Sequence, residues 1–158
     1  MKSEDTVLVA LLRQDSRMSL TEMSRVTKIP VSTIYEKMKH FNRGLIRKHT
    51  ALVDFSQLGF HTRARVLLKA KRTEIERLRE YLLSSSSLNE LYKVNNGYDF
   101  MAEFIFTSMK EMEDYLDVLG EKYGVEKEQV FYIVDEIKRE EFLSKVGVLL
   151  LGKKKVRT

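Results

Sequence analysis

The residues best suited to contact another molecule lie on one face of a predicted helix. Between Val31 and Arg43, the apolar residues Ile34, Met38 and Phe41 recur at the spacing of one helical face. The opposite face carries hydroxyl, carboxylate, amine and imidazole groups from Ser32, Thr33, Tyr35, Glu36, Lys39 and His40. Hydroxyls and lysine can reach phosphates or base edges, and a glutamate can accept a hydrogen bond from cytosine. This face could therefore enter a DNA groove, or it could be the solvated face of a small helical domain.

A basic strip follows this helix in the sequence. It consists of Arg43, Arg47, Lys48 and His49. Positive side chains at such a place would meet the phosphate backbone. Glu36 is expected to lower the affinity for DNA unless it reads a base or is neutralised by Lys39 or His40.

Residues for metal or covalent chemistry do not come together in the sequence. The chain has no cysteine, and its histidines, His40, His49 and His61, are separated by nine and twelve positions. That spacing does not match a zinc site. No catalytic triad order, phosphate-binding glycine loop or dinucleotide motif is present. We therefore expect neither a cofactor nor a metal, and a protein that is not an enzyme.

The charge of the chain is unevenly distributed. Residues 1–61 carry ten Lys and Arg against six Asp and Glu, a net charge of +4. Residues 62–147 carry 14 against 17, a net charge of −3, and residues 148–158 carry four basic residues and no acidic one. Basic ends and an acidic middle are expected if the ends contact phosphate and the middle contacts protein, although chance could give the same distribution.

Three short helices are predicted to position the polar face. The first runs from about Asp5 to Gln14, and the second covers about residues 20–27 after a Ser19–Glu22 capping box. Pro30 then separates the second helix from the third, which Gly44 is placed to stop. The second and third helices have the size of a helix-turn-helix, in which the latter lies in the major groove.

The rest of the chain has strand and helix patterns in alternation. Residues 45–54 are a strand candidate, followed by a connector at 55–59. Strands are predicted at about residues 63–71, 88–94, 98–106 and 130–137. The capping pairs Thr73–Glu76 and Ser108–Glu111 predict a helix after the first and another after the third of these strands. This βαββαβ order predicts a ferredoxin-like sandwich of α+β class after a winged helix-turn-helix. Its open sheet face is expected to be covered by a second copy, in a homodimer or larger assembly.

Several short motifs follow one another along the chain: residues 19–24, Val31-Ser32-Thr33-Ile34, Gly44-Leu45-Ile46, and Asp54 through Gly59. Downstream, Asn96-Gly97-Tyr98-Asp99 leads into a predicted strand. In this order, the first four motifs resemble the N-terminal half of the leucine-responsive and asparagine-synthesis (Lrp/AsnC) family of transcription regulators, and the last looks like the hairpin of that family's regulatory domain. The likeness covers about residues 4–140.

The resemblance implies sequence-specific binding of double-stranded DNA by the third helix, in a homodimer or an oligomer as large as an octamer. DNA contacts then fall on Ser32, Thr33, Tyr35, Glu36, Lys39, His40, Arg43, Arg47 and Lys48. It also implies a small-molecule effector such as an amino acid, at an interface loop formed by Asn95, Asn96, Gly97, Tyr98 and Asp99. Effector-binding relatives have a glycine and an acidic residue before the Tyr-Asp pair, where this chain has Asn96 and Gly97. The Asn-Gly pair is equally well explained as a tight type I′ turn.

These observations give expected domains at residues 1–60 (DNA binding), 61–147 (oligomerisation and effector) and 148–158 (basic tail). The apolar run Val146 to Leu151 is expected to dock as a short strand or helix, and is too short to cross a bilayer. With no signal-like segment, the expected location is cytoplasmic, away from the membrane.

Two alternative functions stay open. The chain could be a weakly specific DNA-compacting protein, or a tetrapyrrole decarboxylase that resembles the same family.

Overall fold

The computed structural model describes residues 3–145 and divides them into two compact units. One unit contains residues 3–51 and 137–145, and the other contains residues 52–136. The chain therefore leaves the first unit after Ala51 and returns to it at Ile137. The functional domains predicted to divide at residues 60 and 147 stay a prediction. The two compact units have other boundaries, at residues 51 and 136. The predicted tail at 148–158 and the run Val146 to Leu151 lie outside the described residues.

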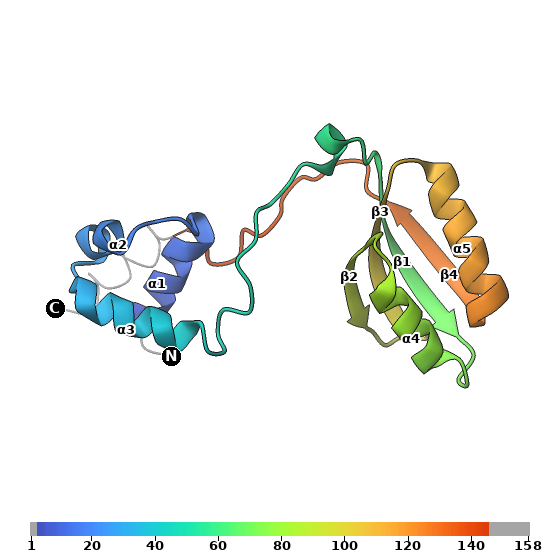
Figure 1. Cartoon of the computed structure of the whole chain (residues 1–158), viewed down its shortest axis with the longest axis horizontal. Coiled ribbons are helices and arrows are strands. Elements are labelled where there is room, and N and C mark those ends of the chain that lie inside the picture. The colour runs from blue at the N-terminus through green and yellow to red at the C-terminus, as the bar shows by residue number, and fades with distance from the viewer. Residues whose placement is uncertain (1–2, 146–158) are drawn as a thin grey trace. The chain divides into compact units, whose positions relative to one another are not determined.

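Three helices form the first unit (Figure 1): α1 (Ser3–Gln14), α2 (Leu20–Thr27) and α3 (Val31–Phe41). Their apolar faces share one core, which consists of Val7, Leu8, Ala10, Leu11, Met23, Ile29, Ile34 and Phe41. The three predicted helices are confirmed, with α3 ending slightly before Arg43. Burying each large aliphatic side chain of this core stabilises the fold by about 1.5–3 kcal/mol.

A capping box begins α2, as the sequence predicts. The Ser19 hydroxyl accepts from the Glu22 backbone N–H at 3.2 Å, and the Ser19 backbone N–H donates to Glu22 Oε2 at 3.0 Å. These hydrogen bonds from Ser19, the backbone one first, lower the pKa of Glu22. Two amides at the helix start are thereby satisfied.

The strand predicted at Leu45–Asp54, and with it a wing built on that strand, is wrong for this chain. Residues 46–54 form neither helix nor strand, and Leu52 is 57% exposed. The sequence pattern of this segment is that of a strand candidate, but a strand also requires a hydrogen-bonded neighbour. The described chain provides no such neighbour for residues 46–54.

The predicted connector is a short 3₁₀ helix, η1 (Phe55–Leu58). Asp54 caps it, since its Oδ1 accepts from the Ser56 hydroxyl at 2.6 Å and from the Ser56 N–H at 3.1 Å. The Ser56 hydroxyl also contributes most to the lowered pKa of Asp54. Gly59 ends the turn at φ 88°, in the left-handed region that glycine tolerates.

The second unit is a four-stranded antiparallel sheet with two helices, in the order β2-β3-β1-β4. Its elements are β1 (Thr62–Ala70), α4 (Ile75–Ser84), β2 (Leu88–Lys93), β3 (Phe100–Phe106), α5 (Met109–Tyr123) and β4 (Val125–Tyr132). The predicted α+β class and ferredoxin-like βαββαβ order are confirmed.

Alternate residues of the central strands face the two helices. In β1, Ala64, Val66, Leu68 and Ala70 are at most 2% exposed. They share a core with Leu78 and Leu82 of α4, with Met112, Leu116 and Leu119 of α5, and with Phe100, Ala102, Phe104 and Phe106 of β3. One face of the sheet is thus covered by this chain, and its other face carries the remaining residues of each strand.

Two predicted element starts differ from the structure. The sequence predicts the last strand at Val130–Ile137, but Gly124 ends α5 at φ 66° and β4 begins directly afterwards at Val125. Pairing with β1 therefore sets the limits of β4, and Val134, beyond it, is 97% exposed. The Thr73–Glu76 capping box is also wrong, because Glu74 is the N-cap residue of α4 and makes no side-chain cap.

Candidate nucleic-acid interface

A tight turn joins α2 to α3. Lys28 ends α2 at φ 60°, and its N–H donates to the Ser24 carbonyl oxygen at 2.8 Å. The Ser24 hydroxyl donates to the Ile29 carbonyl oxygen at 2.6 Å. Pro30 then precedes the first turn of α3, where a missing N–H costs nothing. These bonds fix the direction in which α3 leaves α2.

The buried stripe of α3 determines which of its residues face outward. Ile34 is 0% and Phe41 3% exposed, and Met38 is half-buried. All of the α3 residues predicted to contact DNA are exposed, namely Ser32, Thr33, Tyr35, Glu36, Lys39 and His40. The polar face of α3 is therefore not covered by the rest of its own unit.

Three of these residues contact one another on the surface of α3. Lys39 Nζ lies 3.3 Å from Glu36 Oε1 and 4.6 Å from the centre of the Tyr35 ring. The negative charge of Glu36 is therefore balanced by Lys39 within the helix. Because both side chains are more than half exposed, this ion pair is weak and a phosphate can displace the carboxylate.

Lys37 of α3 forms a contact that the sequence analysis missed. Its Nζ lies 2.5 Å from Asp5 Oδ1 and 3.9 Å from Glu4 Oε2, and joins α3 to α1. The Lys37 side chain is 20% exposed and that of Asp5 is 18% exposed. Lys37 lies three positions after Ile34 and four before Phe41, at the edge of the apolar stripe. This position in the sequence could have indicated that Lys37 faces a neighbouring helix.

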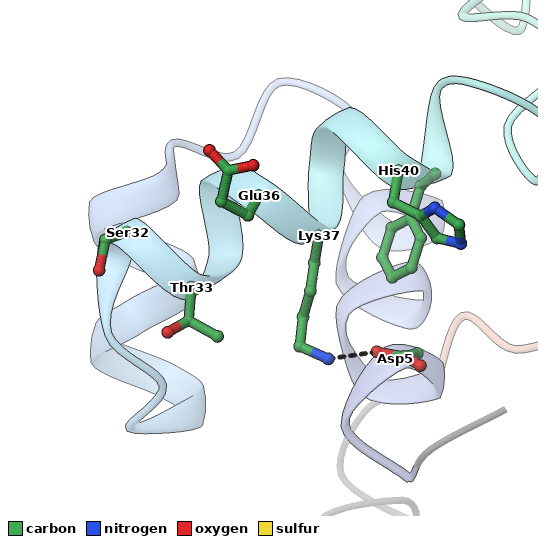
Figure 2. A pocket seen from close by; sticks show the side chains of 7 residues that line it. Asp5, Ser32, Thr33, Glu36, Lys37 and His40 are labelled. Carbon is green, nitrogen blue, oxygen red and sulfur yellow. Dashed lines mark hydrogen bonds and ion pairs between the residues drawn. The ribbon is translucent and has the colours of Figure 1, made fainter.

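The Lys37–Asp5 pair lies in a hollow of about 770 Å³ between α1 and α3 (Figure 2). Its lining residues are Asp5, Ser32, Thr33, Glu36, Lys37, His40 and Phe41. The hollow therefore runs along one edge of the exposed face of α3. Its two carboxylates make it a poor site for an anion, whereas the ion pair in it holds α3 against α1.

The basic strip after α3 is also exposed. Arg43, Arg47, Lys48 and His49 are all accessible, and His49 Nε2 lies 3.5 Å from Asn42 Oδ1. Since residues 46–54 form no strand, these cations sit on an irregular segment and not on a wing.

The loop predicted to bind an effector is a tight turn whose acidic residue is already engaged. Asn96 and Gly97 have φ values of 62° and 88°, as a type I′ turn requires. Asp99 accepts from the Ala70 N–H at 3.0 Å and pairs with Lys69 Nζ at 3.1 Å. The Asp99 carboxylate therefore supports the irregular end of β1. Tyr98 lies beside β4, with its ring 4.9 Å from Lys127 Nζ.

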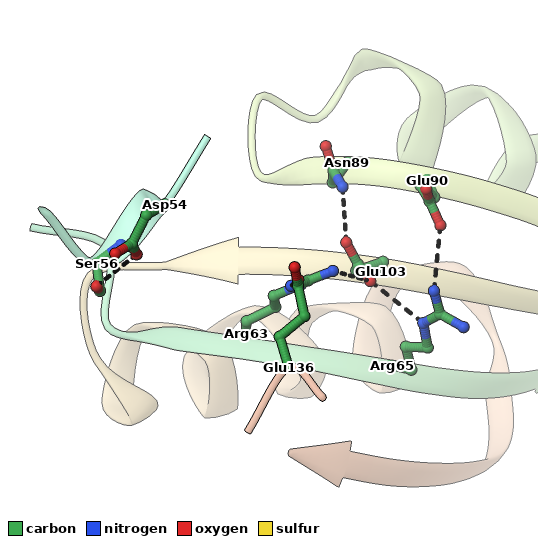
Figure 3. Close-up of polar contacts among 8 residues, drawn as sticks. All are labelled: Asp54, Ser56, Arg63, Arg65, Asn89, Glu90, Glu103 and Glu136. Atoms are coloured by element: carbon green, nitrogen blue, oxygen red, sulfur yellow. Dashed lines mark hydrogen bonds and ion pairs between the residues drawn. The ribbon is translucent and has the colours of Figure 1, made fainter. Parts of the chain in front are cut away.

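A buried carboxylate on the uncovered face of the sheet was not foreseen (Figure 3). Glu103 of β3 is 2% exposed, and its Oε2 lies 3.1 Å from Arg63 Nη2 and 3.2 Å from Arg65 Nε. Its Oε1 accepts from Asn89 Nδ2 at 2.6 Å. Arg63 also pairs with Glu136. Glu103 is the single charged residue in the otherwise apolar sequence of residues 100–106. That isolated charge could have indicated a buried ion pair.

The opposing influences on Glu103 leave it charged. Burial raises the pKa of Glu103, but the hydrogen bonds from Arg63, Asn89 and Arg65 outweigh burial and lower the pKa below its ordinary value. Arg63 Nε is itself buried with no hydrogen-bond partner in the described part of the chain, and the positive charge of Arg63 is balanced by Glu103 and Glu136, which contact its other two nitrogens. This face therefore has a polar centre, surrounded by apolar side chains such as Phe131 and Tyr92, each 48% exposed.

Within residues 3–145, no three His, Cys, Asp or Glu side chains are grouped so that they could hold a metal ion. None of the helices in that range combines the length and apolar character that a membrane span requires.

Comparison with known proteins identifies the class. The HTH-type transcriptional regulator FL11 of Pyrococcus abyssi is 31% identical over 123 residues, 77% of this chain and 82% of the relative. FL11 of Pyrococcus furiosus is 29% identical over the same shares of both chains. No family model matches the chain.

Solved structures share the fold. A transcriptional regulator of Neisseria meningitidis, NMB0573 in complex with L-Met, has a TM-score of 0.81 at 17% identity, covering 88% of this chain and 93% of that one. LrpC of B. subtilis has a TM-score of 0.79 at 22% identity, covering 87% and 97%.

The helix-turn-helix unit, the ferredoxin-like unit and these relatives define a transcription regulator and not an enzyme. The chain belongs to the Lrp/AsnC family of transcription regulators.

Proposed function

We propose that this regulator recognises specific sequences of double-stranded DNA by placing α3 in the major groove. The observation that carries the proposal is the division of α3 into two faces. Ile34 and Phe41 hold one face in the core, and the polar groups of the other face are exposed. A helix held in this way presents its side chains to base edges in a fixed orientation.

Each predicted contact residue has a role that follows from its position. Ser32 and Thr33, at the start of α3, reach phosphates or bases. Lys39 exchanges Glu36 for a phosphate or a guanine edge, which frees Glu36 to accept from cytosine. Tyr35 and His40 flank this pair, and Arg43, Arg47 and Lys48 contact the backbone.

We further propose that the regulator binds as a homodimer or a larger homo-oligomer, as large as an octamer. The second unit exposes Phe131 and Tyr92 on the sheet face that its own helices leave uncovered. A second copy that packs on this face removes apolar surface from water. Two DNA-binding units joined in this way would read two half-sites one helical turn, or a multiple of it, apart.

The loop at residues 95–99 is proposed to take part in binding an amino-acid effector. Support comes from the family and from the Neisseria regulator, which was solved as a complex with L-Met. Because the Asp99 carboxylate is held by Ala70 and Lys69, it shapes the loop and does not receive the effector's ammonium group. The exposed Asn95 and Asn96 are the polar groups left for the ligand.

Selection of genomic DNA fragments by the purified full-length protein tests this function, with each amino acid added in parallel. We expect a small set of enriched fragments that share a pseudo-palindromic sequence, and footprints protected at the helical repeat. Affinities that barely differ between selected and random duplexes at moderate salt would contradict sequence recognition and favour a DNA-compacting role. Enrichment that no amino acid alters would contradict the effector proposal alone.

A further inference from the structure

One arginine of α1 fastens the C-terminal end of the described chain. Arg13 donates from Nε to the Phe142 carbonyl oxygen at 2.5 Å and from Nη2 to the Glu140 carbonyl oxygen at 3.0 Å. The same Nη2 lies 2.7 Å from Glu140 Oε2. A single planar guanidinium therefore holds three oxygens of a segment that is 127 to 129 positions away. Such multiple charge-assisted hydrogen bonds are stronger and more directional than an ordinary surface ion pair.

The segment that Arg13 holds is folded into a turn. Glu140 and Leu143 have φ values of 51° and 62°, which residues other than glycine seldom adopt. The Ser144 N–H and hydroxyl both donate to the Glu141 carbonyl oxygen, at 3.1 and 2.9 Å. Disfavoured backbone of this kind persists where surrounding contacts hold it, which indicates a specific seat on α1.

The path of the chain explains why the Arg13 contact can affect the DNA-binding unit. Residues 137–145 follow the ferredoxin-like unit in sequence, yet they belong to the compact unit formed by α1, α2 and α3. The helix-turn-helix is therefore joined to the other unit by two stretches of chain, the second of which ends at the Arg13 contact. If that contact opens, the second stretch is held less firmly, and the helix-turn-helix gains freedom.

We propose that residues 137–145 form a latch on α1, with Arg13 as its positioning residue. The closed latch restricts the freedom of the DNA-binding unit, and so limits which half-site spacings one oligomer accepts. Opening the latch widens that range. The consequence for spacing rests on the proposed function, the binding of paired half-sites, whereas the latch itself does not.

The test compares full-length Arg13→Ala, Arg13→Lys and Arg79→Ala with the wild-type protein. Arg13→Lys keeps the charge near Glu140 but loses the planar fork that reaches two carbonyl oxygens. Arg79 of α4 is a matched control, because it is an exposed arginine with an i,i+3 glutamate partner in the other unit. Hydrogen–deuterium exchange over residues 138–145 measures the latch, and affinity for duplexes with two half-sites at stepped spacings measures its consequence.

We expect exchange over residues 138–145 to be roughly fivefold faster in Arg13→Ala, intermediate in Arg13→Lys and unchanged in Arg79→Ala. The affinity of Arg13→Ala should fall less steeply than that of wild type as the spacing departs from its optimum. Exchange in Arg13→Ala equal to wild type overturns the latch. Faster exchange with an unchanged spacing profile overturns its control of spacing. Faster exchange in a protein that binds no duplex keeps the latch and removes the proposed function instead.

Discussion

At the scale of the residue, Lys39 is the cation best placed on α3 to exchange a protein partner for a nucleic acid. Its partner Glu36 is 69% exposed, so the pair can separate at little cost. We expect Lys39→Ala to weaken binding to the selected duplex. The slope of log affinity against log salt should fall by about one if Lys39 contacts a phosphate. If it contacts a guanine, base preference at one position should relax.

Fluorescence anisotropy at several salt concentrations measures the effect of Lys39→Ala. Lys110→Ala, which removes an exposed lysine from α5, is the control for overall charge. Equal affinity, slope and base preference in Lys39→Ala and wild type would remove Lys39 from the interface.

Glu103 has a different role, which concerns stability. Its carboxylate holds two arginines on the sheet, and its lowered pKa means that the folded state favours the charged form more than the unfolded state does. The stabilisation is therefore complete above the ordinary glutamate pKa of about 4.3 and is lost as the pH falls through the lower pKa of the folded protein.

We expect Glu103→Gln to lower the free energy of unfolding at pH 7 by about 1–3 kcal/mol, because Arg63 and Arg65 lose their shared counter-charge. Part of this loss is offset by water around Arg65, whose side chain is 45% exposed. The difference between variant and wild type should shrink as the pH falls below 4. Urea unfolding followed by circular dichroism at pH 7 and pH 3.5 measures it, and a constant difference across that range would contradict the assignment.

At the scale of the element, α2 depends on its capping box to begin at Leu20. Ser19→Ala removes the hydroxyl that accepts from the Glu22 N–H, so we expect the free energy of unfolding of the first unit to fall by about 1 kcal/mol. Ser16→Ala changes an exposed serine of the preceding turn and should have little effect. Urea unfolding followed by far-ultraviolet circular dichroism compares the two. Equal stability of the two variants would mean that the cap contributes nothing.

At the scale of the whole molecule, the uncovered sheet face is expected to join two copies. Phe131 is paired with Arg65 across the strands and belongs to this face. Its 48% exposure means that Phe131→Glu costs little within one chain. In an assembly the same change would bury a carboxylate, and should weaken association by about 2 kcal/mol or more.

Light scattering of the eluted protein over a range of concentrations measures this association. Leu83→Glu, a change on the exposed side of α4, is the matched control and should keep the wild-type mass. If Phe131→Glu keeps that mass as well, the copies join through another surface.

The elements that the sequence predicted well are those with a strong local signal. The 3.6-residue recurrence of Ile34, Met38 and Phe41, the alternation in β1 and the Asn96–Gly97 turn each depend on neighbours a few positions apart. The last strand was misplaced because the apolar run at residues 130–134 continues past the end of β4, whereas the polar residues 127–129 give no apolar signal although they pair with β1. Residues 45–54 failed as a strand for the same reason, since a pattern of apolar residues does not provide a hydrogen-bonded neighbour.

The sequence by itself determined the helices, the order of the elements and the exposed face of α3, because side-chain periodicity fixes which groups can be buried together. Only the tertiary structure decided that Glu103 is buried among arginines, that Lys37 meets Asp5, and that Arg13 holds residues 140–142. These contacts join positions 32 to 129 residues apart. Their existence depends on where the folded chain brings its segments, which local patterns do not encode.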